Sequence, residues 1–391
     1  MKEIVIIDGA RTAIGKFNGA LKNLHVSDLG AIVIEEALKR SGVQKKDVNE
    51  VVMGCVGQVA EDAFMARRCA IKAGLPVETT AYTVNRLCSS GLQAIVCGMM
   101  AIQTGDAEIV VAGGGESMNN LPYYVNNARF GLRMGDAILQ DGLVTALSDP
   151  FNGYHMGMTA ENVAAQYHIS REDQDAWAFR SQRLATKAVA DGVFKDEIIP
   201  ITIKEKKEEL VFDTDEYIRA DTTLEKLAKL RPAFKENGTV TAGNASGIND
   251  GAAAVVMMSA EKAKKLGLKP KMSIVAQAAA GVDPSIMGVG PVPSTKKAIE
   301  RSGLKLDDID IIELNEAFAA QTLACIRELG LDESKVNIHG GAIAMGHPIG
   351  GTGAILTVKL MYHMQKSAAQ YGLETLCIGG GQGLTVIYKR L

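Results

Sequence analysis

Short apolar runs and longer amphipathic stretches alternate along this chain of 391 residues. The run IVII near the N-terminus and residues 81–84, AYTV, predict strands. The nearly uncharged stretch 89–100 that follows predicts a buried helix. Residues 170–190 mix apolar and charged positions as a surface helix does, and Ser170 with Asp173 forms a capping-box-like start.

One part of this pattern occurs twice. Residues 37–53, ALKRSGVQKKDVNEVVM, resemble residues 298–314, AIERSGLKLDDIDIIEL. In both copies Ala, Arg-Ser-Gly and Asp are in register, and each copy predicts a helix followed by a strand. Gly42 and Gly303 stand where a helix of this kind ends, because glycine readily adopts the left-handed C-terminal conformation.

The repetition continues in the same order further along the chain. VVAGGG at 110–115 is matched by LCIGGG at 376–381. Gly251 with the following AAAVVMM is matched by Gly383 with LTVIYKR. Several blocks that agree in order indicate a duplicated α/β fold, with two mixed-sheet halves in a layered α-β-α-β-α arrangement.

The two copies differ by a long insertion in the first. We expect an N-terminal core half at 1–117 and 249–270, an inserted loop domain at 118–248 and a C-terminal core half at 271–391. A long insertion with its own helices suggests a substrate-binding lobe, an oligomerisation arm or both.

The composition is that of a soluble globular protein, with 47% hydrophobic and 22% charged residues. A net charge of −3 gives no overall attraction to nucleic acid or to an anionic membrane. The first residues lack the cleavage site of a signal peptide, and we find no apolar stretch of the roughly 20 residues that a bilayer requires. We therefore expect a cytoplasmic protein without nucleic-acid or membrane partners.

Six cysteines are scattered without a CxxC pair, which fits neither a disulfide scaffold nor a zinc site. Cys88 differs from the others because it lies between a predicted strand and a predicted helix. The helix dipole and free N–H groups at such a junction favour a nucleophilic thiolate. The alternative is a small apolar core residue, as we interpret Cys69 and Cys97.

Three further residues near the C-terminus have suitable chemistry. His347, between Gly and Pro, must lie in a loop and is either catalytic or a structural hydrogen-bonding residue. Cys377 precedes three glycines whose N–H groups could approach a substrate closely. Asn315 follows a predicted strand, where it is either a helix N-cap or a ligand contact.

Together these residues lie in motifs that resemble the thiolase family over nearly the whole chain, with the closest match to its biosynthetic branch. The matching stretches are ARTAIGKFNGAL, VNRLCSSGLQAI, GGGESM, YHMGMTAEN, KLRPAF, GTVTAGNASGINDGAAA, ELNEAFAAQ, GGAIAMGHPIGGTGA and LCIGGGQG. The resemblance implies an acyltransferase that condenses two acetyl-CoA into acetoacetyl-CoA and CoA, and catalyses the reverse thiolysis. It implies no cofactor and no metal, because the CoA thioesters are the substrates.

The resemblance also assigns roles. Cys88 would carry the acetyl group with His347 as its base, and Cys377 would take the α-proton of the second acetyl-CoA. Asn315 would fix a water at the enolate oxygen, and the N–H groups of Cys88 and Gly379 would hold the acyl oxygen. The residues implied for CoA binding are Leu147, His155, Met156, Arg219, Phe234, Ala242, Ser246, Met287, Ala317 and Phe318.

The family resemblance further implies a homotetramer, a dimer of dimers, assembled through a loop within 118–140. The chain departs from the family pattern at Ser89, usually Gly, at Thr352, where GGTG replaces GASG, and at Lys226, often Ser. These departures remove no catalytic group.

Three alternatives stay open at this point. A degradative 3-ketoacyl-CoA thiolase would use the same residues with a longer pocket. A ketoacyl-synthase-like enzyme is disfavoured because Cys377 stands where that class uses histidine. A CoA-binding scaffold without turnover is disfavoured because the four chemical groups are intact.

Overall fold

The computed structural model describes residues 2–205 and 208–391, and it contains one order of elements twice. The first half has β1 (Ile4–Thr12), α1 (Val26–Ser41), β3 (Glu50–Gly54), α2 (Met65–Lys72), β4 (Thr80–Val84), α3 (Ser90–Thr104), β5 (Ile109–Ser117) and β13 (Asn249–Ser259). The second half has β14 (Met272–Gly281), α9 (Pro291–Ser302), β15 (Ile311–Leu314), α10 (Ala319–Leu329), α11 (Ala342–Met345), α12 (Thr352–Ser367), β16 (Tyr371–Ile378) and β17 (Gln382–Arg390). The predicted duplication is therefore confirmed.

The repeated helix ends in the same way in both halves. Gly42 follows α1 with φ +73°, and Gly303 follows α9 with φ +72°. This left-handed conformation costs glycine no steric energy, whereas a side chain is strained there. The two glycines thus end the helices at equivalent points and direct the chain toward β3 and β15.

The two halves share one mixed sheet with the strand order β15-β16-β17-β14-β1-β13-β5-β3-β4. In the first half β3 pairs parallel with β4 and β5, and in the second β15 pairs parallel with β16. The halves meet where β1 and β14 pair at two positions, Val5 with Ser273 and Ile6 with Met272. The counterpart of β4 is reduced to a single parallel bridge between Ile312 and Val336.

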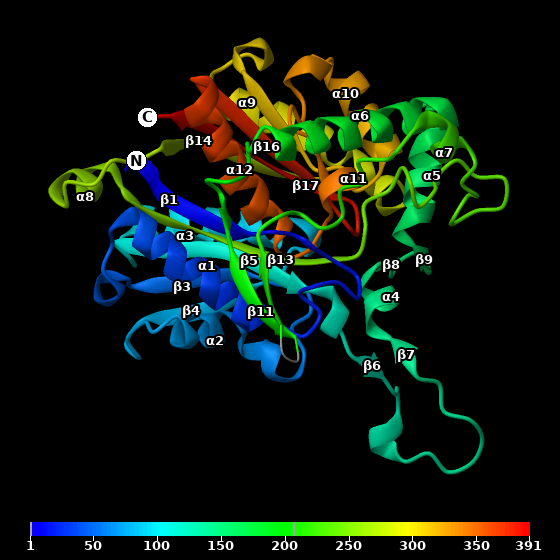
Figure 1. The fold of residues 1–391 in the computed structure, drawn as a ribbon, viewed down its shortest axis with the longest axis horizontal. Helices are drawn as coiled ribbons and strands as arrows, with labels where there is room; N and C mark the ends of the chain where they lie inside the picture. Colours follow the sequence, from blue (N-terminus) through cyan, green and yellow to red (C-terminus); the bar gives the residue numbers. More distant parts are fainter. Residues whose placement is uncertain (1, 206–207) are drawn as a thin grey trace.

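Helices cover the sheet in layers (Figure 1). α3 and α12 pack against each other, α3 mainly on β5 and β3 of the first half, and α12 on both β13 of the first half and β16 of the second, which makes them the central layer. α1 packs with α2 against the first half, and α9 and α10 pack together beside the second. This is the expected α-β-α-β-α arrangement, and it places the N-terminal ends of both central helices, α3 and α12, inside the molecule.

One helical segment among the described residues, Leu87–Thr104, is long and apolar enough to cross a membrane, although we predicted none from the sequence. It includes α3, and 56% of it is buried inside the fold. Its contacts with β5 and α12 are those of a core helix.

The segment between β5 and β13 extends from 118 to 248. Its elements are β6 (Tyr123–Tyr124), β7 (Gln140–Asp141), α4 (Gly142–Ala146), β8 (Ser148–Asp149), β9 (Tyr154–His155), α5 (Met156–Gln166), α6 (Arg171–Ala190), β10 (Ile198–Ile199), β11 (Ile201–Glu205), β12 (Glu208–Phe212) and α7 (Leu224–Ala228). Ser170 caps α6 by accepting a hydrogen bond from the Asp173 N–H, as predicted. Besides short 3-10 turns, the part of the chain that the structure describes also contains β2 (Gly15–Lys16) and α8 (Ala260–Lys265).

The helices of this segment join the core of the second half. Trp177 of α6 is buried and shares one apolar cluster with Leu314 and Leu323. Its indole N–H donates to the buried carboxylate of Glu316 at 3.0 Å. The segment thus covers the second half closely, and the cavity described below lies along this contact.

A buried ion network ties the same segment to the first half. The Arg11 guanidinium on β1 donates to Asp215 at 2.8 and 3.0 Å and to Glu197 at 2.8 Å, and all three side chains are buried. A second buried pair joins Lys359 of α12 to Glu313 of β15 at 2.7 Å. The first network ties the segment 118–248 to β1, and the second pair ties α12 to β15 within the second half.

Candidate active site

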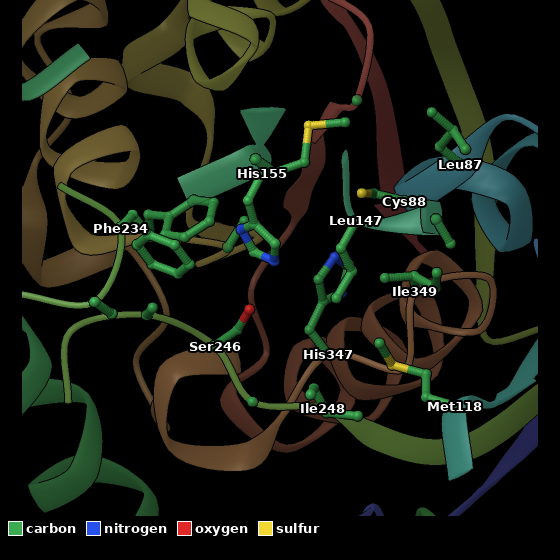
Figure 2. Close-up of a pocket in the computed structure, with 18 of the residues that line it drawn as sticks. Leu87, Cys88, Met118, Leu147, His155, Phe234, Ser246, Ile248, His347 and Ile349 are labelled. Carbon is green, nitrogen blue, oxygen red and sulfur yellow. The ribbon is translucent and has the colours of Figure 1, made fainter. Parts of the chain in front are cut away.

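A cavity of about 340 Å³ brings together residues from both halves and from the segment 118–248 (Figure 2). Of the fifteen predicted site residues, twelve line it: Cys88, Leu147, His155, Met156, Phe234, Ala242, Ser246, Met287, Ala317, Phe318, His347 and Gly379. Cys377, Asn315 and Arg219 are outside this lining. Cys377 and Asn315 are buried in the core, whereas Arg219 is exposed.

Cys88 lies in a single 3-10 turn, Leu87–Ser89, directly before α3. Leu87 has a left-handed φ of +47°, and its N–H is held by the Asn85 side chain at 2.9 Å. The Ser90 hydroxyl adds a further restraint, because it donates to the Leu87 carbonyl at 2.7 Å. This strained, over-determined turn presents the sulfur to the cavity.

Two opposing effects act on the pKa of the Cys88 thiol. Burial raises its pKa, while the backbone N–H groups of Gly379 and Cys88 lower it. Burial prevails, so the pKa stands above its ordinary value and the resting group is the thiol. The backbone N–H groups act in the expected direction, but burial outweighs them in the resting state. Deprotonation requires a base at the moment of reaction.

His347 is well placed to be that base. Its ring Nδ1 lies 2.7 Å from the Thr352 hydroxyl, which also donates to the Pro348 carbonyl at 2.9 Å. A hydroxyl has one proton, so while Thr352 donates to Pro348 it accepts from Nδ1–H. The Nε2 lone pair of His347 is then the acceptor on the cavity side, where the Asn315 amide nitrogen approaches it at 3.5 Å. Burial lowers the pKa of His347 to about 4, which keeps the ring neutral.

The backbone around His347 is held as firmly as the ring. Its N–H donates to the Asn249 side chain at 3.0 Å. Gly346 before it has φ +111°, and a Cβ there would meet the Asn249 amide. Only glycine allows Asn249 to approach this closely, so the motif fixes His347 through its glycine as well as through its histidine.

Asn315 faces His347 from the end of β15. Its side-chain Nδ2 lies 3.5 Å from His347 Nε2, and its Oδ1 has no hydrogen-bond partner among the described residues. The N-cap alternative is wrong, because α10 begins at Ala319 and Phe318 occupies the cap position. A buried amide oxygen without a protein partner indicates a site for a bound water or ligand.

Cys377 is the penultimate residue of β16 and is completely buried. It packs with Met156, Met287 and Phe318, all of which line the cavity. Burial raises the pKa of its thiol well above the ordinary value, and the nearby Cys88 raises it further. The two sulfurs are thus neighbours in an apolar environment, and both rest as neutral thiols.

Gly379 can bring its backbone N–H close to Cys88 because it has no side chain. A Cβ at this position would lie 2.8 Å from Met156 Cε and 3.0 Å from Leu87 Cδ1. With glycine, the backbone N–H reaches the Cys88 sulfur. This N–H and that of Cys88 can together stabilise an oxygen that becomes negative at the carbon under attack.

A second histidine faces the same cavity from the other side (Figure 2). His155 caps α5, and its Nδ1 accepts a hydrogen bond from the Gly157 N–H at 3.0 Å. Nδ1 is therefore unprotonated and Nε2 carries the proton. The ring stacks on Phe234 at 4.7 Å, and burial lowers its pKa. His155 is thus a neutral donor, whereas resting His347 is a neutral acceptor.

Arg219 is the predicted site residue that the structure separates most clearly from the cavity. Its guanidinium lies over the Tyr217 ring at 4.7 Å, and Tyr217 lines the cavity. Lys226, one of the departures from the family pattern, pairs with Asp221 at 2.6 Å on the surface. The departure at Ser89 is completely buried, and its hydroxyl has no partner among the described residues.

Sequence reasoning missed nine residues of the lining: Leu87, Met118, Ala146, Tyr217, Ala233, Ala245, Gly247, Ile248 and Ile349. Most of them adjoin a predicted residue along the chain, so the motifs contained their signal. Met118 ends the GGGESM stretch but was assigned no role, and Tyr217 had no such signal, because an aromatic side chain in a long connection is uninformative without the fold.

A cysteine, a neutral histidine base, a buried second cysteine and two convergent N–H groups define a class of enzymes that transfer acyl groups through a cysteine. Family models for the N-terminal domain of thiolase and the C-terminal domain of thiolase match residues 4–261 and 268–390. The chain therefore belongs to the thiolase family, and it is an acyltransferase.

Known proteins resemble the chain along its whole length. It is 52% identical to the acetyl-CoA acetyltransferase of Syntrophomonas wolfei, with 100% of each chain covered. The crystal structure of the acetyl-CoA acetyltransferase of Bacillus anthracis superposes with a TM-score of 0.99 at 48% identity, covering 100% of this chain and 99% of that one. Human mitochondrial 3-ketoacyl-CoA thiolase in complex with CoA superposes with a TM-score of 0.96 at 44% identity, covering 100% and 98%.

Proposed function

We propose that the protein is an acetyl-CoA C-acetyltransferase, which condenses two acetyl-CoA into acetoacetyl-CoA and CoA and also catalyses the reverse thiolysis. The observation that carries the proposal is the shared cavity of Cys88 and His347, with the Gly379 N–H on the sulfur and Cys377 buried beside it. The names of the relatives point to the same reaction.

The first half-reaction moves the acetyl group to the enzyme. Cys88 gives its proton to His347 Nε2 as its sulfur attacks the thioester carbonyl, and the N–H groups of Cys88 and Gly379 receive the developing negative charge. The carbon–sulfur bond to CoA then breaks. The departing CoA sulfur takes the proton from His347, which leaves acetyl-Cys88 and free CoA.

The second half-reaction forms the carbon–carbon bond. Cys377 rests as a thiol, so it first gives its proton to His347 Nε2. As the thiolate it then removes a proton from the methyl group of a second acetyl-CoA, and the resulting carbanion attacks acetyl-Cys88. The enolate oxygen is held by a water on Asn315 and by the protonated Nε2 of His347, while Nδ1–H of the ring still donates to the Thr352 hydroxyl. As the bond between the acetyl carbon and the Cys88 sulfur breaks and acetoacetyl-CoA leaves, the Cys88 sulfur takes the proton from His347, and Cys377 keeps the proton of the methyl group.

The proposed CoA channel runs past His155, Phe234 and Ser246, with Arg219 outside it on Tyr217. Arg219 is exposed there and has the charge needed to attract a CoA phosphate. His155 offers one oriented N–H donor to an amide carbonyl of the pantetheine. The remaining lining is apolar, as the thin pantetheine arm requires.

We also propose a homotetramer assembled as a dimer of dimers. The segment 123–141 projects from the body as an arm (Figure 1), and its apolar side chains are uncovered: Phe130 is 87%, Met134 96% and Ile138 81% exposed. β4 forms the open edge of the sheet and carries the exposed Tyr82. We propose that the β4 edge forms the contact within each dimer and that the arm forms the contact between dimers.

The division into 1–117 with 249–270, 118–248 and 271–391 is proposed to be functional, with the middle part carrying the CoA channel and the tetramer arm. We further propose that the enzyme works in the cytoplasm, without a cofactor, and on CoA thioesters rather than on nucleic acid or membranes. The net charge of −3 gives no overall attraction to nucleic acid or to an anionic membrane.

The assay that tests the function is CoA-dependent cleavage of acetoacetyl-CoA beside a medium-chain 3-ketoacyl-CoA, with Cys88→Ala as the control. Rapid cleavage of acetoacetyl-CoA alone, lost in the variant, is the expected result. Comparable cleavage of both substrates would instead establish a degradative 3-ketoacyl-CoA thiolase. No cleavage of either, with CoA still bound, would overturn the enzymatic assignment.

A further inference from the structure

Glu116 is a buried carboxylate that the chemistry described so far does not use. It follows the three glycines of β5, and only 1% of it is exposed. It accepts hydrogen bonds from the N–H groups of Val56 at 3.0 Å, Gly57 at 3.0 Å and Gly350 at 2.9 Å. The Cys55 thiol approaches the same carboxylate at 3.5 Å.

All four neighbours of this carboxylate are donors. An ionised carboxylate has only acceptors, so it satisfies every one of them. Burial raises the pKa of Glu116, and the three backbone N–H groups lower it. An amide in its place would turn its NH₂ group toward at least one of these N–H groups, and one contact would become a clash of donors.

Two glycines lie against this carboxylate, and Gly350 is the one that it requires. A Cβ at Gly350 would lie 2.5 Å from Glu116 Oε2, and a Cβ at Gly57 would lie 3.1 Å from Oε1. Any side chain at Gly350 would therefore force the carboxylate or the loop to move. Glycine is thus needed at the last position of the GHPIG sequence, because only a residue without a side chain lets the Glu116 carboxylate reach the backbone N–H group there.

The groups that Glu116 joins belong to the two catalytic partners. Gly350 lies three residues after His347 in the same loop. Val56 and Gly57 follow β3, whose neighbour β4 leads directly into the Cys88 turn, and the Cys55 N–H bonds to the last residue of β4 at 3.1 Å. One carboxylate therefore links the strand pair beneath the nucleophile to the loop of the base, across the boundary of the two halves.

We propose that Glu116 is a positioning residue that holds the His347 loop in place against Cys88. The inference rests on the proposed function, because it assigns His347 as the base for Cys88. Misplacement of a catalytic group by about 1 Å costs on the order of a hundredfold in rate. The charge of Glu116 also acts on the nucleophile, since it raises the Cys88 pKa.

Glu374 provides a matched control. It is a completely buried carboxylate on β16 of the other half, where it accepts a hydrogen bond from Thr357 at 2.6 Å. It does not line the cavity. Glu374→Gln therefore reports the general cost of replacing a buried carboxylate by an amide, and Glu116→Gln adds any effect on the catalytic pair.

The experiment compares wild type, Glu116→Gln, Glu116→Asp and Glu374→Gln in the thiolysis of acetoacetyl-CoA and in the pH dependence of Cys88 alkylation by iodoacetamide. Glu116→Gln is expected to lower kcat about a hundredfold with little change in KM. Its alkylation midpoint is expected to shift to lower pH, because a negative charge near the thiol is lost. Glu116→Asp keeps the charge but withdraws the oxygens, so kcat falls while the alkylation midpoint stays.

The expected result for Glu374→Gln is lower thermal stability with an unchanged kcat. Equal loss of kcat in Glu116→Gln and Glu374→Gln, with no shift in alkylation, would overturn the positioning role and leave Glu116 as ordinary core structure. If Glu116→Gln fails to fold, Glu116→Asp tests the positioning role instead: a lower kcat with an unchanged alkylation midpoint supports it, and an unchanged kcat overturns it. If the wild type lacks thiolase activity, the proposed function fails, and an unshifted alkylation midpoint would then also remove the link between Glu116 and Cys88.

Discussion

The ring Nδ1 of His347 and the hydroxyl of Thr352 lie 2.7 Å apart, and this contact determines which nitrogen of His347 faces Cys88 as a base. The hydroxyl belongs to the first residue of α12, so the central helix of the second half sets the ring orientation. The sequence departs from the family at this position, where GGTG replaces GASG, yet threonine retains the hydroxyl that the contact needs.

Thr352→Val keeps the shape of the side chain and removes its hydroxyl, which leaves Nδ1–H of His347 without a partner. We expect kcat for thiolysis to fall about tenfold or more at nearly constant KM, because the cost of one lost buried hydrogen bond is about 1–3 kcal/mol. Thr352→Ser restores the hydroxyl and is expected to retain most of the activity. Steady-state kinetics of the two variants test this prediction. Equal activity of Thr352→Val and Thr352→Ser would show that the hydroxyl does not orient His347.

The resting protonation of Cys88 can be read from its alkylation by iodoacetamide. Burial raises the Cys88 pKa, so the rate should keep increasing with pH beyond about 8.5, where an ordinary cysteine titrates. Peptide mass spectrometry identifies the alkylated residue, and Cys88→Ala is the control. A midpoint below neutral pH would show a resting thiolate and contradict the account.

Stability should decrease in mild acid for a definite reason. Burial lowers the pKa of both His347 and His339 to about 4 in the folded chain, whereas unfolded histidines titrate near 6.5. The unfolded state therefore binds more protons between these values, and the free energy of unfolding falls as the pH drops from about 6.5 to 4. Denaturant titrations across this range measure the slope, and His339→Gln should reduce it. A free energy that rises as the pH drops would be inconsistent with these two neutral histidines.

Gly379→Ala is expected to reduce kcat by roughly a hundredfold or more, as the loss of one oxyanion donor does in other enzymes. The added Cβ would lie 2.8 Å from Met156 Cε and would push the N–H away from Cys88. Gly380→Ala provides a neighbouring control, although its φ of +81° adds backbone strain, so thermal stability must be measured for both. Wild-type turnover in Gly379→Ala would show that this N–H does not act on the acyl oxygen.

The arm provides a prediction about assembly. Replacing Phe130, Met134 and Ile138 together by Ser removes the most exposed apolar side chains of the segment 123–141. We expect dimers instead of tetramers in light scattering at equal concentration, with the thermal unfolding of the body unchanged. A variant that stays tetrameric would place the contact elsewhere.

Much of the fold could be predicted because similar sequence blocks occur twice in the same order. Gly42 and Gly303 end equivalent helices, and the insertion was delimited by the two glycine runs. The continuity of the sheet through β1 and β14 could not be predicted, since it depends on only two residue pairs far apart in the chain.

The site was predictable where a residue has distinctive chemistry within a motif. Cys88, His347 and Gly379 are of this kind. The state of Cys88 was not predictable, because local position favours a thiolate and only the fold reveals that burial prevails. Tyr217, and Glu116 within the GGGESM stretch, were assigned no role for a related reason: each acts through contacts with segments that are distant in sequence.

The most direct test of the account is the mass of the protein after brief exposure to acetyl-CoA. The account predicts a gain of one acetyl group, located on Cys88 by peptide mapping, lost on addition of CoA and absent in Cys88→Ala. The Cys377→Ala variant should still be acetylated, because Cys377 acts only in the second half-reaction. Acetylation of another residue, or turnover of acetoacetyl-CoA by Cys88→Ala, would contradict the central role of Cys88.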